Sequence, residues 1–225
     1  MIKERRNNET TLKHLFVIII ISLILLTGCS YQKDGGVVSG NLSFYLKTSD
    51  KKVIAGLLDP RVTIYATGEK DGFYEGLVIE LGDTPLQVSW ESVSDPDYAP
   101  QLFIADLNKD GKNELVIILT EQCAEGNIKQ HLRIMEIDSQ HEVDVLQPME
   151  ILDNYTDDSA ITQDAIIQSS NIGNSIEFTI ENNKLKGIVS ITDTRSSMKV
   201  GEIVITYKHT DAGYSYEHIQ TTTNY

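Results

Sequence analysis

The C-terminal third of the chain alternates apolar with polar residues at every second position. In residues 175–182, Ile176, Phe178 and Ile180 alternate with polar side chains. The same alternation recurs in residues 185–191, 200–209 and 214–221, and short turns containing Asn, Asp or Gly separate these runs. A period of two is typical of antiparallel strands with one face in the core and the other in water. We therefore predict an antiparallel β-meander over residues 175–221.

The preceding part of the chain is also dominated by short strand-like runs with turn residues between them. Residues 115–120 are apolar except for the last, which is typical of a central strand that is buried on both faces. The only helix that the pattern indicates is short, over residues 159–169, with Asp158 as its N-cap. We predict a mainly β fold with antiparallel sheets and at most one short helix.

The first 28 residues have a different pattern and do not belong to the predicted fold. Basic residues dominate the opening, and the 13 residues from Leu15 to Thr27 are uncharged. This run is shorter than the ~20 residues that a membrane-spanning helix needs. A basic start, a short apolar run and small residues before a cleavage point are the features of a secretory signal.

The residues Leu26, Thr27, Gly28 and Cys29 resemble the lipobox of bacterial lipoprotein signals, in which Leu, a small residue and Gly or Ala precede Cys. The resemblance implies cleavage before Cys29, lipidation of its sulfur, and anchoring at the extracytoplasmic face of the cell membrane. The alternative is a short N-terminal anchor that is never cleaved. Two or more acyl chains hold a protein stably at a membrane, whereas one does not. Residues 29–41 would then form a flexible, Gly-rich tether.

The charge and the cysteines limit what the rest of the chain can do. Removing residues 1–28 leaves 197 of 225 residues and changes the net charge from −14 to −16, because four basic and two acidic side chains are lost. Such a charge argues against nucleic acid as a partner and favours cation binding. If Cys29 is lipidated, Cys123 is the only other cysteine, so no intramolecular disulfide is expected.

Residues 106–114 combine the residue types that bind a hard cation. Oxygen-bearing side chains occupy positions 1, 3, 5 and 9 of this segment, and Gly111 occupies position 6. Loops deliver oxygen ligands to Ca²⁺ from positions 1, 3, 5, 7 and 9. An EF-hand would need Glu at position 12, where this chain has Ile117, so we predict a calcium loop between two strands. The alternative is a turn without an ion. The predicted ligands are Asp106, Asn108, Asp110, the main-chain carbonyl of Lys112, and Glu114.

The loop and its flanks resemble the FG-GAP/VCBS type of repeat, in which a strand leads into an Asp-rich loop and an apolar strand leads out. Residues 102–105 match the first strand and residues 115–120 the second. The resemblance implies blade-like β units that bind Ca²⁺. A weaker copy of the loop lies 39 residues upstream, at residues 67–75. Two of its oxygen ligands are replaced by Thr67 and Glu69, so we expect this copy to keep the turn and lose most affinity for an ion.

Outside the predicted calcium loop, the sequence gives little indication of a catalytic or binding site. The sequence contains no motif typical of serine hydrolases, zinc proteases or nucleotide-binding proteins. Four histidines lack metal-ligand spacing, and three tyrosines are either core residues or an aromatic platform for a sugar. These are His131, His141, His209 and His218, and Tyr207, Tyr214 and Tyr216.

We predict four segments and one broad function. The segments are a signal peptide (1–28), a tether (29–41), an FG-GAP/VCBS-like β region (42–147) and a C-terminal β-meander region (148–225). Because the metal ligands come from one local loop with no neighbouring base, the ion is expected to be structural. The sequence favours a non-enzymatic envelope lipoprotein for binding, adhesion or scaffolding, with an envelope ligand or protein as its partner. The alternative is a cell-wall-active envelope enzyme or an accessory subunit of one.

Overall fold

The computed structural model describes residues 38–39, 47–48, 51–82, 84–124, 126–155 and 170–223. The predicted signal peptide, Cys29 and the predicted helix over residues 159–169 lie outside the described residues. The chain divides into two units, residues 1–34 and 35–225, and every described residue belongs to the second unit. Within the described ranges, no helix has the length and apolar character that crossing a membrane requires.

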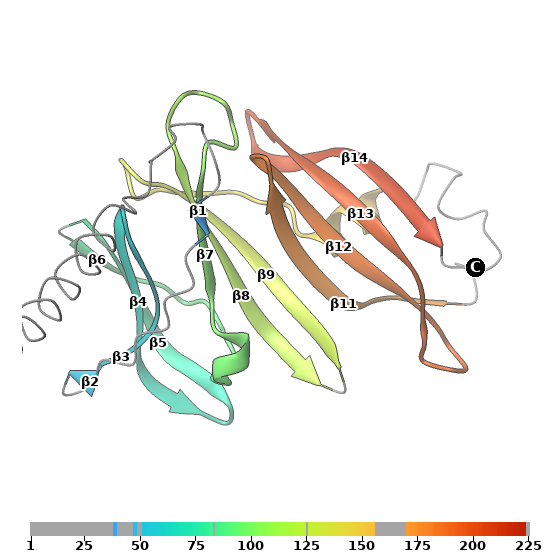
Figure 1. Ribbon diagram of the computed structural model, residues 1–225, viewed down its shortest axis with the longest axis horizontal. Helices are drawn as coiled ribbons and strands as arrows, with labels where there is room; N and C mark the ends of the chain where they lie inside the picture. The colour runs from blue at the N-terminus through green and yellow to red at the C-terminus, as the bar shows by residue number, and fades with distance from the viewer. Residues whose placement is uncertain are drawn as a thin grey trace, which may run out of the picture. The chain divides into compact units, whose positions relative to one another are not determined.

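The described residues form two β-sheets (Figure 1). The smaller has five strands in the order β2-β3-β4-β5-β6. Its strands are β2 (Lys47–Thr48), β3 (Lys51–Leu58), β4 (Arg61–Lys70), β5 (Phe73–Leu81) and β6 (Thr84–Gln87). A 3-10 helix, η1 (Pro96–Tyr98), lies between this sheet and the next strand along the chain.

The larger sheet has nine strands in the order β1-β7-β8-β9-β11-β12-β13-β14, with β10 paired to β9. The strands are β1 (Val38–Ser39), β7 (Gln101–Ala105), β8 (Glu114–Ala124), β9 (Asn127–Glu136), β10 (Glu142–Val143), β11 (Ser170–Glu181), β12 (Lys184–Asp193), β13 (Lys199–Thr210) and β14 (Gly213–Thr223). The α-helix among the described residues is α2 (Pro148–Asn154). The predicted fold class, mainly β with antiparallel sheets and at most one short helix, is confirmed.

The C-terminal meander is formed by β11, β12, β13 and β14, each paired antiparallel to the next. The prediction of a meander over residues 175–221 is therefore confirmed, although β11 begins at Ser170 and β14 ends at Thr223. The meander is joined to β9 in a different way, because β11 runs parallel to β9. Ile176 of β11 and Lys129 of β9 are the only residues of these two strands that pair. One sheet thus continues across the predicted boundary between residues 147 and 148.

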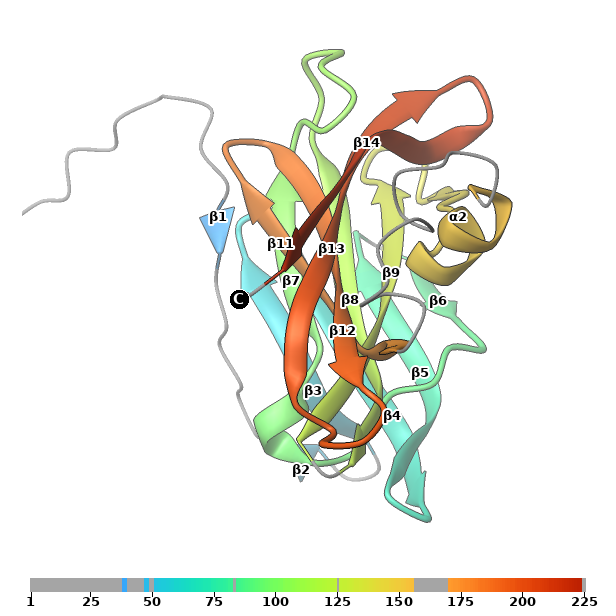
Figure 2. The same ribbon diagram turned by 90° about the vertical axis from the view of Figure 1, so that its right-hand side faces the viewer.

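Strand β8 is buried on both faces because it separates two hydrophobic cores. Leu115, Ile117 and Leu119 point into a core shared with the five-stranded sheet. The alternate residues Val116 and Ile118 point into a second core, which they share with β11, β12, β13 and α2. Figure 2 shows the ribbons of these elements. Because every side chain of this run faces one core or the other, the strand needs the continuous apolar sequence that predicted it.

Two residues of the predicted tether are part of the sheet. Val38 and Ser39 form β1 and pair antiparallel with Ile104 and Phe103 of β7. They thereby cover the edge of β7 that does not face β8. The flexible tether over residues 29–41 stays a prediction.

Candidate metal centre

The predicted calcium loop connects β7 to β8 and closes where Ala105 pairs with Glu114. Side chains within the loop hold its main chain: Asn108 Oδ1 accepts a hydrogen bond from the Asp110 N–H at 2.9 Å, and Asp110 Oδ1 accepts one from the Lys112 N–H at 2.8 Å. Such bonds to the residue two positions on are typical of Asx-turns. Gly111 has a φ of 87°, a conformation that glycine adopts without strain. The loop sequence therefore folds back on itself through local contacts.

Three carboxylates converge within this loop. One oxygen from each of Asp106, Asp110 and Glu114 lies within 4.8 Å of the other two. Two oxygens bound to one Ca²⁺ at 2.3–2.6 Å can lie up to about 5 Å apart, so this spacing fits a shared cation. Glu114 is buried at the start of β8, whereas Asp106 is half-buried and Asp110 exposed. Of the described residues, no other group of three His, Cys, Asp or Glu side chains converges in this way.

The oxygens of the cluster are only partly satisfied by hydrogen bonds. Glu114 Oε2 accepts a bond from the Leu107 N–H at 2.8 Å, and Asp106 Oδ2 accepts one from the Gly111 N–H at 3.2 Å. Asp106 Oδ1 is buried and has no hydrogen-bond partner. A buried polar atom without a partner is rare in native proteins and is a common sign of an ion or a water. The donor set and this oxygen both fit a hard cation such as Ca²⁺.

The electrostatics of the loop favour a cation. Burial raises the pKa of Glu114, the hydrogen bond from Leu107 lowers it, and the carboxylates of Asp106 and Asp110 raise it again. Burial and like charge thus both oppose the ionised form of this carboxyl. A cation between the three carboxylates would remove the repulsion that they exert on one another.

The other two predicted ligands lie in the same loop. The Nζ of Lys112 forms an ion pair with Asp138 at 3.1 Å, so this group is engaged by a carboxylate outside the cluster of three. This leaves its main-chain carbonyl as the group predicted to bind the ion. Asn108 already uses Oδ1 to hold the Asp110 N–H. Ile117, at position 12 of the loop, lies fully buried in β8, as a strand rather than an EF-hand helix requires.

The upstream copy of the loop has a different shape. Lys70 pairs with Phe73, so β4 and β5 are joined by the two-residue turn Asp71-Gly72. Most residues that match the calcium loop are here paired in the strands, which leaves no free chain to close around an ion. The two copies also lie in different sheets. The blade-like character of the two units stays a prediction.

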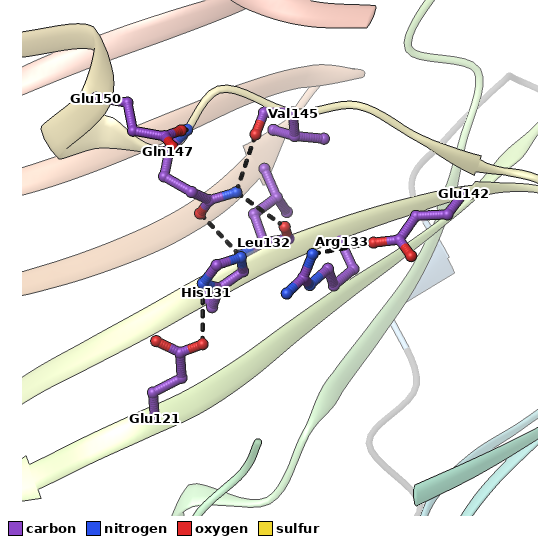
Figure 3. Close-up of polar contacts among 8 residues, drawn as sticks. All are labelled: Glu121, His131, Leu132, Arg133, Glu142, Val145, Gln147 and Glu150. Atoms are coloured by element: carbon purple, nitrogen blue, oxygen red, sulfur yellow. Dashed lines mark hydrogen bonds and ion pairs between the residues drawn. The ribbon is translucent and has the colours of Figure 1, made fainter. Parts of the chain in front are cut away.

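A second group of polar residues borders a cavity of about 210 Å³ between β9 and residues 142–150 (Figure 3). Its wall includes His131, Arg133, Glu142, Asp144 and Glu150. Most of these groups already have protein partners: Arg133 Nη1 contacts Glu142 Oε1 at 3.1 Å, and Glu150 Oε2 accepts the Gln147 N–H at 2.8 Å. The cavity is therefore polar, with most of its charges paired inside the protein.

The contact between His131 and Glu121 was not predicted from the sequence. His131 Nδ1 lies 2.9 Å from Glu121 Oε1, and this hydrogen bond lowers the pKa of Glu121 against the opposing effect of burial. Glu121 is the extra residue of a β-bulge, because Thr120 and Gln122 pair with consecutive residues of β9. A bulge redirects a side chain in this way. No spacing in the sequence signals it, since the bulge depends on the register between two strands.

The tyrosines do not form an aromatic platform. Tyr207 and Tyr214 are 6% and 3% exposed and belong to the second core, whereas Tyr216 is 37% exposed. The Tyr207 hydroxyl donates a hydrogen bond to the Leu146 carbonyl at 3.0 Å. The interpretation of Tyr207 and Tyr214 as core residues is therefore correct. Cys123, which lies on β8, is a half-buried free cysteine.

Comparisons with protein-family models, with curated proteins and with solved structures gave no match to this chain.

Proposed function

We propose that this protein is an envelope lipoprotein, anchored through lipid on Cys29, whose β-sheet unit is a non-enzymatic binding, adhesion or scaffolding module stabilised by Ca²⁺. The ligands would be Asp106, Asn108, Asp110, the carbonyl of Lys112, and Glu114. The ion would fix the connection between β7 and β8, and β8 carries side chains of both cores. Its role would be to keep a secreted β-domain without an expected disulfide rigid outside the cytoplasm.

One observation carries the proposal. Three carboxylates lie within 4.8 Å of one another, and one of their oxygens is buried without a partner. Without a cation, like charges at this distance repel one another. The net charge of −14 makes the protein a general attractor of cations, but only this loop gathers carboxylates closely enough among the described residues.

Calorimetric titration of the full-length chain with Ca²⁺ in detergent tests the proposal. We expect one binding event, which Asp110→Ala abolishes. Asp71→Ala is the matched control, because Asp71 occupies the equivalent place in the upstream copy but lies in a tight hairpin turn. The absence of binding to wild-type protein, or equal loss in both variants, would refute the site.

A second candidate function, an envelope enzyme or an accessory subunit of one that acts on the cell wall, is favoured by the cavity beside β9. A histidine hydrogen-bonded to a carboxylate is a usual component of general acid–base sites, and this pair adjoins a polar cavity. Purified protein would then release soluble fragments from peptidoglycan, and His131→Ala would stop the release. Unchanged peptidoglycan after incubation with wild-type protein would remove this candidate.

A further inference from the structure

Tyr214, at the start of β14, is held in place by main-chain contacts on both sides. Its N–H donates to the Asp144 carbonyl at 2.7 Å, and its carbonyl accepts from the Leu146 N–H at 3.0 Å. The preceding residue must be small, because a Cβ at Gly213 would overlap the Asp144 carbonyl. The position of the tyrosine ring is therefore set by the segment that precedes α2 as well as by β14.

Tyr214 belongs to the second hydrophobic core, which also contains residues at the start of the predicted calcium loop. It belongs to the same buried cluster as Ala105 and Leu107, the two residues that flank Asp106. The edge of the His209 ring packs on it at a centroid distance of 5.1 Å. The ring is thus held in the second core and against His209 of β13, so its hydroxyl is the group whose partner has to be identified.

That hydroxyl is buried and has no hydrogen-bond partner. Buried tyrosine hydroxyls normally have one, because the group loses its bonds to water on folding. Among the described residues only three buried side-chain atoms have no partner: Asp106 Oδ1, the Tyr214 hydroxyl and Arg133 Nε. Two of the three belong to Asp106 and to Tyr214, and Tyr214 lies in the same core as the two residues that flank Asp106.

The electrostatic surroundings of the hydroxyl point to the same loop. Burial raises the pKa of Tyr214 strongly, and the next contributions come from the carboxylates of Glu114, Asp106 and Asp110. The negative charges of the proposed ligands therefore act on this hydroxyl. Yet it forms no direct hydrogen bond with Asp106 Oδ1, although one group can donate and the other can accept.

We propose that Tyr214 is part of the cation site, where its hydroxyl holds a water molecule that is itself a ligand of the ion bound by residues 106–114. This proposal rests on the proposed cation site. The loop offers five protein ligands, whereas Ca²⁺ takes six to eight oxygens, so at least one water completes the shell when each ligand binds through one oxygen. A cation-bound water is a strong donor, and the tyrosine oxygen accepts its hydrogen bond while the hydroxyl hydrogen is directed to a carboxylate.

The consequence is a link between two distant parts of the chain. Tyr214 belongs to β14 and is bonded to residues 144 and 146, whereas the ion is held between β7 and β8. Binding of the cation would satisfy the hydroxyl and fix β14 against the loop. The C-terminal meander would therefore become more ordered when the cation binds.

The test compares Tyr214→Phe with Tyr207→Phe in the full-length protein in detergent. Both tyrosines are buried in the same core, but Tyr207 already donates to the Leu146 carbonyl. We expect Tyr214→Phe to weaken Ca²⁺ binding about tenfold or more, as loss of a group that orients a ligand usually does. Tyr207→Phe should leave the affinity within about twofold. In chelator the order reverses, because only Tyr207→Phe removes a hydrogen bond and lowers the melting temperature.

Terbium emission provides a second measurement that does not depend on affinity. Tb³⁺ replaces Ca²⁺ in oxygen sites and emits when a nearby tyrosine transfers energy to it. Emission sensitised at the tyrosine absorption should fall in Tyr214→Phe even at saturating Tb³⁺ and should persist in Tyr207→Phe. If wild type binds Ca²⁺ and Tyr214→Phe binds equally tightly with unchanged emission, Tyr214 is not part of the site while the site itself stands. If wild type binds no Ca²⁺, both proposals are wrong.

Discussion

The side-chain amide of Gln147 pairs with the main chain of Leu132 as a neighbouring strand would. Its Nε2 donates to the Leu132 carbonyl at 3.1 Å, and its Oε1 accepts from the Leu132 N–H at 3.3 Å (Figure 3). Leu132 lies on the edge of β9, between the residues that pair with β10 and the one that pairs with β11. A side chain thus completes the hydrogen bonding of β9 where the two neighbouring strands separate.

Gln147→Leu should therefore destabilise the protein. The change keeps the size of the side chain but leaves two main-chain groups of Leu132 without partners, at about 1–3 kcal/mol for each buried group. We expect a loss of about 2–4 kcal/mol, or a fall in melting temperature of roughly 5–15 °C. Gln220→Leu, at an exposed position on β14, is the control and should change the melting temperature little. Equal melting temperatures for wild type and Gln147→Leu would show that the pairing contributes no stability.

The strands could be predicted from the sequence because their burial is a local pattern. Alternation over residues 175–191 mirrors the alternate burial of β11 and β12, and the apolar run from Leu115 mirrors the two cores on either side of β8. The turn between β11 and β12 could also be predicted, because Asn182 and Asn183 both have positive φ, which Asn adopts more readily than most residues.

The arrangement of the strands could not be predicted in the same way. The parallel pair between Ile176 and Lys129 and the bulge at Glu121 depend on register between distant segments. Helix α2 was missed although it has a usual start signal, with Pro148 in its first turn and the Glu150 carboxylate accepting the Gln147 N–H. A pattern search for long amphipathic runs does not detect a helix of this length.

The candidate site shows the same limit. The carboxylates of the loop could be predicted because loop spacing alone brings Asp106, Asp110 and Glu114 together. The place of Tyr214 in the same core as Ala105 and Leu107 could not, because it depends on the path of β14. The upstream copy shows that a shared Asp-Gly pair does not determine the shape of a loop, since residues 71–72 form a tight hairpin turn instead of an open loop.

Lipidation of Cys29 is tested by labelling cells with a fatty acid. Cys29→Ala should abolish the label and leave an uncut or misprocessed precursor, because the sulfur is the acceptor that the lipobox resemblance implies. Cys123→Ala should keep the label, since the other thiol lies on β8. Equal label in wild type and Cys29→Ala would rule out the assignment.

The contact between Glu121 and His131 should make stability depend on acid pH. The pKa of Glu121 is lowered on folding, chiefly by the hydrogen bond from His131. Its contribution is therefore present above the ordinary carboxyl pKa and is lost as the pH falls through the lower, folded-state value. The Glu121 side chain is 39% exposed, so we expect about 1 kcal/mol or less.

Thermal melts of wild type and Glu121→Gln between neutral pH and about pH 2.5 measure this contribution. The variant should melt a few degrees lower at neutral pH, and the difference should vanish at the acid end, where protonated Glu and Gln are similar. Glu217→Gln, at an exposed position on β14, should show no such convergence. A difference that stays constant with pH would mean that the ionised carboxylate does not stabilise the fold.

The buried carboxylate of Glu114 should have opposite effects on stability with and without Ca²⁺. In chelator, Glu114→Gln removes a buried charge that Asp106 and Asp110 repel, while the new amide oxygen can still accept the Leu107 N–H. The variant should therefore melt at a higher temperature than wild type.

In Ca²⁺ at a hundred times its dissociation constant, wild type should gain about 2.7 kcal/mol by mass action. That gain corresponds to roughly 5–10 °C for a protein of this size, and Glu114→Gln should lose most of it. Melts of both proteins in chelator and in millimolar Ca²⁺ decide the matter, because a residue that only packs β8 would lower the melting temperature in both conditions when replaced. Crossing of the two pairs of melting temperatures is expected only if Glu114 binds the ion.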